Sequence, residues 1–226
     1  MTIHEILTTL RQASKPENIE GMKRFGIDTA HAIGVSIPPI RVLAKKIKKN
    51  HELALALWKT NIHEARILAS LVDDPKLVTA AQIDEWVQDF NSWDICDQVC
   101  GNLFDRTPYA IPKIKEFSAR KEEYVKRAGF TLIAEFAMHN KTADDEVFIE
   151  FFPIIEREAW DERNFVKKAV NWALRQTGKR NAVLHKEAIL CANRILLQDS
   201  KAAKWVAKNA LTELITFGKK GDFKVG

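Results

Sequence analysis

Apolar residues recur at intervals of three and four along almost the whole chain, and this spacing is the strongest constraint on the fold. Such a period places the apolar side chains on one face of an α-helix. Between Ile37 and Lys49 the pattern returns once per turn, and Pro38 and Pro39 occupy the first turn, where a missing N–H costs least. Only 9 glycines and 7 prolines occur in 226 residues, whereas a sandwich or barrel needs turn signals every ~8–12 residues. The sequence therefore predicts an all-α fold.

The same period predicts a series of helices separated by short turns. The breaks are caps and turns such as Asp73-Asp74-Pro75 and Thr107-Pro108, and no change in composition marks a domain boundary. We therefore expect residues 1–226 to form a single domain. The predicted helices span residues 3–13, 16–26, 37–49, 51–59, 62–72, 79–89, 92–105, 109–118, 122–138, 143–157, 161–177, 183–197 and 199–217.

Three of these helices resemble one another. Residues 63–69, 124–130 and 165–171 each begin with polar or basic side chains and continue with small apolar ones. Helix pairs of about 40 residues with loose self-similarity are typical of HEAT-like repeats. The sequence predicts a right-handed superhelical solenoid of HEAT-like antiparallel helix pairs, whose concave groove is lined by the second helix of each pair. An irregular helical bundle is the alternative.

The net charge of +5 hides a strong asymmetry along the chain. Residues 1–162 carry 21 lysines and arginines against 26 aspartates and glutamates, while residues 163–226 carry 14 against 4. A basic block of this kind favours a polyanionic partner, nucleic acid first, over an ordinary solvated surface. Residues 218–226 are expected to be a mobile basic tail.

The cysteines and histidines do not indicate a metal site. Cys96, Cys100 and Cys191 are odd in number and lack a second ligand pair, so we expect small buried residues in a reducing compartment. The histidines show no ligand spacing, and the chain has neither a phosphate-binding glycine loop nor a nucleophile elbow. The amino terminus has no signal pattern, and no uncharged run reaches the ~20 residues of a membrane span. We expect a soluble, cytoplasmic, monomeric protein without metal or cofactor.

One tryptophan lies on the wrong side of its helix. In residues 161–177 the apolar stripe is formed by Val166, Val170 and Leu174, and Trp172 lies about 150° from its centre at 100° per residue. Cations surround it on the helix surface. This arrangement favours contact with nucleic acid, and packing against an adjacent repeat is the alternative. The neighbouring residues are Phe165, Lys168, Arg175, Gln176 and Lys179.

Two other helices present unusual side chains opposite their apolar stripes. Trp93 and Asp97 are one turn apart in residues 92–105, and Arg127 lies beside Thr131 in residues 122–138. Successive second helices would then present tryptophan, aspartate, arginine and tryptophan to one groove. The alternatives are a plain surface charge for Asp97 and a solvent-exposed cation for Arg127.

Three segments together resemble the bacterial DNA alkylation repair enzymes of the AlkD type. They are residues 92–97, residues 126–128 and residues 165–175, and the resemblance extends over most of the chain from about residue 34. The combination of Trp-x-x-x-Asp with a later Lys-Ala-x-x-Trp-x-Leu-Arg carries it. The resemblance implies HEAT-like repeats, a basic groove for duplex DNA, and glycosylase activity on cationic N3- or N7-alkylated purines such as 3-methyladenine and 7-methylguanine, without a closed pocket for a flipped base.

Site residues follow from the resemblance position by position. It makes Asp97 the catalytic carboxylate, Trp93 and Trp172 aromatic walls beside the lesion, and Arg127 a contact to a nearby phosphate. Further DNA contacts are expected from the cations Lys168, Arg175, Lys179 and Arg66.

One departure concerns the amino-terminal wall. Family members also present an aromatic residue from an early helix, where this chain has Gly21-Met22-Lys23, with Phe25 the nearest aromatic. The missing aromatic favours a second hypothesis, a non-catalytic protein that binds distorted or branched DNA. A HEAT-type scaffold for other proteins is a third, and it would show no salt-dependent affinity for DNA.

Overall fold

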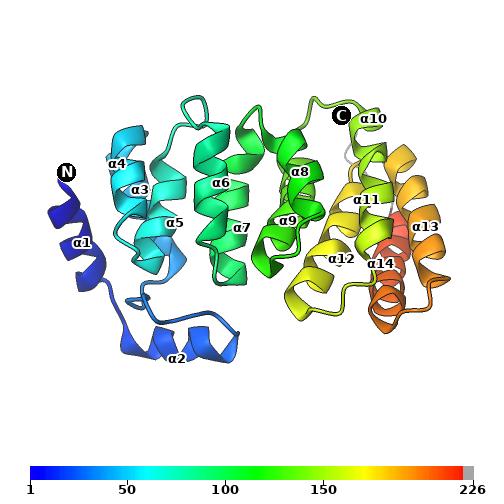
Figure 1. Cartoon of the computed structure of the whole chain (residues 1–226), viewed down its shortest axis with the longest axis horizontal. Coiled ribbons are helices and arrows are strands. Elements are labelled where there is room, and N and C mark those ends of the chain that lie inside the picture. Colours follow the sequence, from blue (N-terminus) through cyan, green and yellow to red (C-terminus); the bar gives the residue numbers. More distant parts are fainter. Residues whose placement is uncertain (221–226) are drawn as a thin grey trace. The chain divides into compact units, whose positions relative to one another are not determined.

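The computed structural model describes residues 1–220, which form α-helices, one short 3-10 helix and no strand. The predicted all-α fold is therefore confirmed for this part of the chain. The chain forms two compact units, an amino-terminal unit of Met1–Thr107 and a carboxy-terminal unit that begins at Pro108. The helices of both are drawn in Figure 1.

Helices of the amino-terminal unit form two layers. Its elements are α1 (Ile3–Gln12), α2 (Pro16–Arg24), α3 (Ile37–Ile47), α4 (His51–Trp58), α5 (His63–Val72), α6 (Ala80–Gln88), α7 (Trp93–Asn102) and the 3-10 helix η1 (Phe104–Arg106). Helix α5 packs against α3, α4 and α7. Trp58 of α4 stacks on Trp86 of α6, with ring centroids 4.0 Å apart and planes within 2° of parallel. Thus α4 and α6 form one layer, and α5 and α7 form the other.

The carboxy-terminal unit repeats this two-layer arrangement. Its elements are α8 (Ala110–Ser118), α9 (Glu123–His139), α10 (Asp145–Ile149), α11 (Phe151–Glu158), α12 (Asn164–Gly178), α13 (Ala182–Leu196) and α14 (Lys201–Lys220). Helix α12 packs against both α9 and α14, and α8, α11 and α13 pack on the other side of these helices (Figure 1). The pairs α8–α9, α11–α12 and α13–α14 are antiparallel neighbours of the predicted kind.

Two predicted helices are shorter than their patterns suggest. The segment 143–157 divides at Glu150 into α10 and α11, because Pro153 cannot donate to the carbonyl of Ile149 and its ring crowds that turn. The segment 92–105 ends at Asn102 and tightens into η1. The other predicted helices end within a few residues of those observed.

The buried residues agree with the predicted apolar faces. Ile95 and Val99 of α7, and Val166 and Val170 of α12, are at most 1% exposed. All three cysteines are buried, as predicted. Within residues 1–220 no helix is long and apolar enough to cross a bilayer.

The predictions that depend on how the two units combine stay predictions. These are the single domain over residues 1–226 and the right-handed superhelix. Residues 218–220 of the predicted tail belong to α14, and residues 221–226 lie outside the described residues.

Candidate nucleic-acid interface

Helix α7 is fixed at its amino terminus by the segment that follows α2. The indole Nε1 of Trp93 donates to the carbonyl oxygen of Phe25 at 3.0 Å. The hydroxyl of Ser92 accepts from the backbone N–H of Asp28 at 2.9 Å, and Asn91 Nδ2 donates to the Asp28 carboxylate at 2.9 Å. These three bonds hold Trp93 in place at the beginning of α7.

Phe25 is brought to the same end of α7 by these contacts. It is 72% exposed, the most exposed phenylalanine of the described residues. A large aromatic that stays in water beside Trp93 gains little from the core, and it is available to a ligand.

Asp97 lies one turn beyond Trp93 and is partly exposed, while Cys96 and Val99 beside it are buried. The helix thus presents the carboxylate away from its apolar face, as the sequence predicts. Trp93 is also partly exposed. The structure therefore brings these two predicted residues together on one surface of α7.

Asp94, three residues earlier than Asp97, has a different role. Its Oδ2 lies 2.8 Å from His63 Nε2 at the start of α5, and its Oδ1 is buried without a hydrogen-bond partner. Burial by itself lowers the pKa of His63, but the hydrogen bond and negative charge of Asp94 outweigh burial, so the pKa is raised above 6.5. This pair ties α5 to α7.

Glu64 fixes the loop between α2 and α3. Its carboxylate is 1% exposed and accepts from three successive backbone N–H groups, those of Ile33, Gly34 and Val35, at 2.7–3.1 Å. A buried carboxylate with several charge-assisted hydrogen bonds is well satisfied and holds its partners firmly.

Arg66, one of the predicted DNA contacts, is engaged within the amino-terminal unit. Its Nη2 lies 2.7 Å from Asp89 Oδ2, and its guanidinium carbon lies 4.9 Å from the centroid of the Trp58 ring. The structure places this cation in the packing of α4, α5 and α6.

Arg127 is buried in α9 at 5% exposure, and its Nη1 donates to the carbonyl oxygen of Phe165 at 2.6 Å. The alternative interpretation of Arg127 as a solvent-exposed cation is therefore wrong. Apolar periodicity could not show this, because α9 is covered on nearly all sides by α8 and α12.

Helix α12 carries the other predicted residues. Trp172 is partly exposed and Lys168 is exposed. Arg175 and Lys179 both pair with Glu213 of α14. Burial raises the pKa of Glu213, but the hydrogen bonds and charges of Lys179 and Arg175 outweigh it, so the pKa is lowered. The structure thus joins these two cations across α12 and α14, while Lys168 stays in solvent.

The predicted residues fall into two groups, one in each unit. Trp93, Asp97 and Arg66 belong to the amino-terminal unit, and Arg127, Lys168, Trp172, Arg175 and Lys179 belong to the carboxy-terminal unit. A single groove that contains both groups stays a prediction. Within residues 1–220, no cluster of three or more histidines, cysteines and carboxylates could hold a metal ion.

Three features of the structure did not follow from the sequence. The Trp93–Phe25 bond uses a backbone carbonyl 68 residues away, which no side-chain pattern encodes. The pairing of Glu213 with Arg175 and Lys179 depends on how α14 packs against α12, which sequence spacing does not show. Trp160, between α11 and α12, is 54% exposed, and its position in a turn has no periodicity that would single it out.

Comparisons with known proteins provide a matching family model, a relative and a similar solved structure. A family model described as DNA alkylation repair enzyme matches residues 6–214. An uncharacterized protein of Listeria innocua, Lin0241, is 22% identical over 199 residues, which cover 86% of this chain and 87% of that protein.

A solved structure is similar over almost the whole chain. It is described as a new family of proteins related to the HEAT-like repeat DNA glycosylases with affinity for branched DNA structures. The TM-score is 0.77 at 20% sequence identity, over 92% of this chain and 94% of that one. This likeness establishes the HEAT-like fold.

Proposed function

The chain belongs to the DNA alkylation repair enzyme family, and from this we propose that it is a DNA glycosylase. In this proposal it hydrolyses the N-glycosidic bond of cationic N3- or N7-alkylated purines, such as 3-methyladenine and 7-methylguanine, in duplex DNA. It acts as a monomer and needs neither a metal nor a cofactor.

The observation that carries the proposal is the pairing of Trp93 and Asp97 on α7. Trp93 is held by the Phe25 carbonyl, and Asp97 is presented one turn later on the same partly exposed surface. A carboxylate on a rigid helix beside an aromatic plate suits a reaction that develops positive charge on a sugar.

The chemistry needs little acid catalysis. Alkylation at N3 or N7 makes the purine a cation, so it leaves as a neutral base when its bond to C1′ breaks. The sugar then carries the positive charge, and the Asp97 carboxylate stabilises this oxocarbenium-like state and orients water. The water oxygen bonds to C1′, and its proton passes to Asp97 or to solvent.

The remaining residues bind the substrate. The faces of Trp93 and Trp172 attract the cationic base and pack on deoxyribose. Arg127 contacts a phosphate near the lesion, and the exposed Lys168 contributes positive potential along the duplex. Arg175, Lys179 and Arg66 bind phosphate by exchanging it for the carboxylates of Glu213 and Asp89, with which they pair. Phe25, held next to Trp93, takes the place of the early aromatic that residues 21–23 lack. The lesion is approached from the backbone side without a closed base pocket.

Release of alkylated bases from methylated duplex DNA tests the proposal directly. We expect Asp97→Asn to bind this DNA as the wild type does and to lose base release by on the order of 100-fold or more, as when one preorganised electrostatic group is removed. Glu85→Gln is the matched control, since it removes an exposed carboxylate from α6 in the same unit. Wild-type release by Asp97→Asn would contradict the assignment.

A second candidate is a non-catalytic protein that binds branched DNA. The similar solved structure, whose description names affinity for branched DNA structures, favours it. Base release by the wild type separates the two candidates. A wild type that releases no base but prefers a three-way junction to a linear duplex of equal length would support the second.

A further inference from the structure

A separate pocket of 1210 Å³ opens in the carboxy-terminal unit, where three helix-connecting turns meet. These are the turns from α8 to α9, from α11 to α12 and from α13 to α14, and none of the proposed glycosylase residues lines the pocket. The volume exceeds that of most small-molecule sites, which range over about 300–1,000 Å³.

Trp160 lies in the wall of this pocket and is 54% exposed. The ammonium of Lys126 lies 5.7 Å from the centroid of its ring. An indole that is half in water gains little from the core, and its face can stack on another π-system. Trp160 thus has the properties of a stacking platform.

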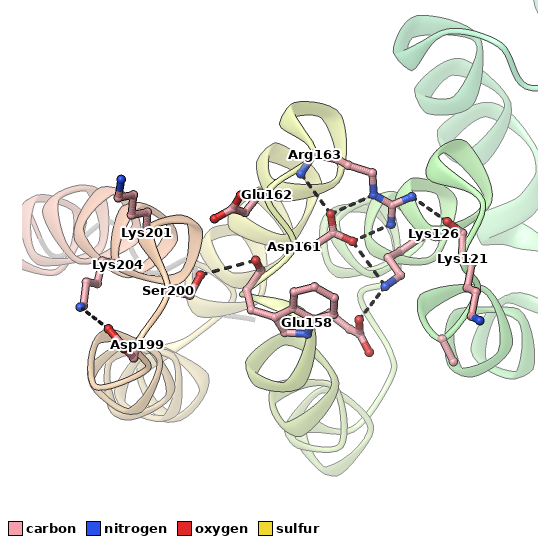
Figure 2. Close-up of a pocket in the computed structure, with 12 residues that line it drawn as sticks. Lys121, Lys126, Glu158, Asp161, Glu162, Arg163, Asp199, Ser200, Lys201 and Lys204 are labelled. Atoms are coloured by element: carbon pink, nitrogen blue, oxygen red, sulfur yellow. Dashed lines mark hydrogen bonds and ion pairs between the residues drawn. The ribbon is translucent and has the colours of Figure 1, made fainter.

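Two carboxylates of the pocket, Glu158 and Asp161, are neutralised by cations of the same wall (Figure 2). Lys126 lies 2.7 Å from Glu158 and 3.4 Å from Asp161, and Arg163 lies 2.6 Å from Asp161. Arg163 also donates to the carbonyl of Lys121 at 2.6 Å, which fixes the turn before α9. This network makes a rigid floor and leaves little net negative charge there.

The opposite wall is positive. Lys201 and Lys204 are exposed there, in the first turn of α14, while Lys121 is exposed on the side of Arg163, on the turn before α9 (Figure 2). Ser200 caps α14 by accepting from the N–H of Ala203 at 3.2 Å, so the positive end of a 20-residue helix also faces this region. Lys204 Nζ lies 3.4 Å from Asp199 Oδ1 at the surface, where an ion pair contributes little, so phosphate can take the place of Asp199.

We propose that this pocket binds a single-stranded segment of nucleic acid. An unpaired base stacks on Trp160, and the adjoining phosphates meet Lys201, Lys204 and Lys121. A single strand is required because the faces of a paired base are already covered by its neighbours in the duplex, whereas single-strand sites combine aromatic plates with cations. This inference goes beyond the proposed function, since base release uses none of these residues.

Affinity for a fluorescein-labelled oligothymidylate, measured by anisotropy at fixed salt, tests the pocket. We expect Trp160→Ala to weaken binding about tenfold, the loss of one stacked base, and Trp160→Phe to retain most of the affinity. Trp205→Ala is the matched control. Trp205 is also partly exposed and lies under a cation, Lys167, in the same unit, but it does not line the pocket. Equal losses for Trp160→Ala and Trp205→Ala, or no loss for the former, would overturn the proposal.

Charge variants make a second, directional test. Lys201→Ala is expected to weaken oligothymidylate binding, and Glu162→Gln to strengthen it, because Glu162 is an exposed carboxylate of the lining. Thymidine monophosphate is added as competitor. Weak competition supports a strand that spans several subsites, whereas competition as strong as that of the oligonucleotide would overturn the assignment to a strand.

The same protein preparations distinguish this inference from the proposed function. On linear methylated duplex, Trp160→Ala is expected to release bases at the wild-type rate, while Asp97→Asn keeps its affinity for oligothymidylate. Loss of base release in Trp160→Ala would contradict the separation of the two sites. If the wild type has no glycosylase activity, the proposed function is wrong, and the affinity for oligothymidylate still tests the pocket by itself.

Discussion

His63 and Asp94 form a buried pair whose charge depends on pH. The pKa of His63 is raised above 6.5 in the folded protein because the hydrogen bond and charge of Asp94 outweigh the effect of burial. A group whose pKa is higher in the folded than in the unfolded protein contributes its full stabilisation below its unfolded-state pKa. This contribution is lost as the pH rises through its folded-state pKa. The pair therefore adds stability in mildly acidic solution.

We expect the free energy of unfolding of the wild type to fall as pH rises from about 6.5 through the raised pKa of His63. Urea unfolding of the wild type and His63→Gln, below and well above pH 6.5, measures the contribution. His4→Gln, which changes an exposed histidine, is the control and should follow the wild type. A His63→Gln variant with undiminished pH dependence would show that other groups cause it.

Single residues were predictable where their own helix gave the signal. Trp93, Asp97 and Trp172 stand opposite apolar stripes, so the 100° period identified them as partly exposed side chains. The clamp of Glu64 on the loop at Ile33–Val35 was not predictable, because it joins a helix residue to backbone groups about 30 positions away. The spacing of residues in the sequence does not indicate which distant groups form such bonds.

At the scale of elements, α8 and α9 approach each other closely at Gly129. A Cβ at this position would lie 2.5 Å from the backbone nitrogen of Ser118, which cannot move away as a flexible side chain can. The glycine therefore sets how near the two helices can pack.

We expect Gly129→Ala to lower the free energy of unfolding by about 1–3 kcal/mol, the usual cost of overpacking. Gly21→Ala is the matched control in α2, where a Cβ would meet nothing within 4 Å. That change should be neutral or stabilise by up to about 1 kcal/mol through helix propensity. Urea unfolding of the three proteins measures both effects, and equal stability of the two variants would refute the close-contact argument.

Helix positions were well predicted because a helix that is buried on one face has apolar residues at a period of 3.6 residues. The period fails where a helix is buried on several faces. Helix α9 is the example, since Lys126, Arg127 and Thr131 are all at most 6% exposed despite their polarity. The apolar pattern of residues 143–157 continues across Glu150, so periodicity alone does not predict the break that Pro153 causes.

For the whole molecule, the basic surplus of residues 163–226 is only partly available to a polyanion. Arg163, Arg175, Lys179 and Arg194 pair with carboxylates within the carboxy-terminal unit. The exposed lysines, such as Lys168 and Lys201, carry the remaining positive potential. Composition could give the surplus, but only the fold shows which cations are already neutralised.

We expect the affinity for linear duplex DNA to fall steeply with salt, and Lys168→Ala to reduce the slope of log K against log salt by about 0.9, the release of one counterion. Lys186→Ala, which removes an exposed lysine from α13 in the other layer of the same unit, should leave the slope unchanged. Titrations at several salt concentrations provide the slopes. The same reduction for both variants would show that Lys168 acts only through net charge.

The attachment of α2 has a consequence for local unfolding. None of its residues is buried, and the segments beside it are held by the polar bonds of Trp93, Ser92 and Glu64. Water can replace such bonds, whereas it opposes the exposure of the apolar face of α7. Amide protons of α2 should therefore exchange with solvent deuterium well before those of α7, and the amino-terminal edge opens while the helix that carries Asp97 stays folded.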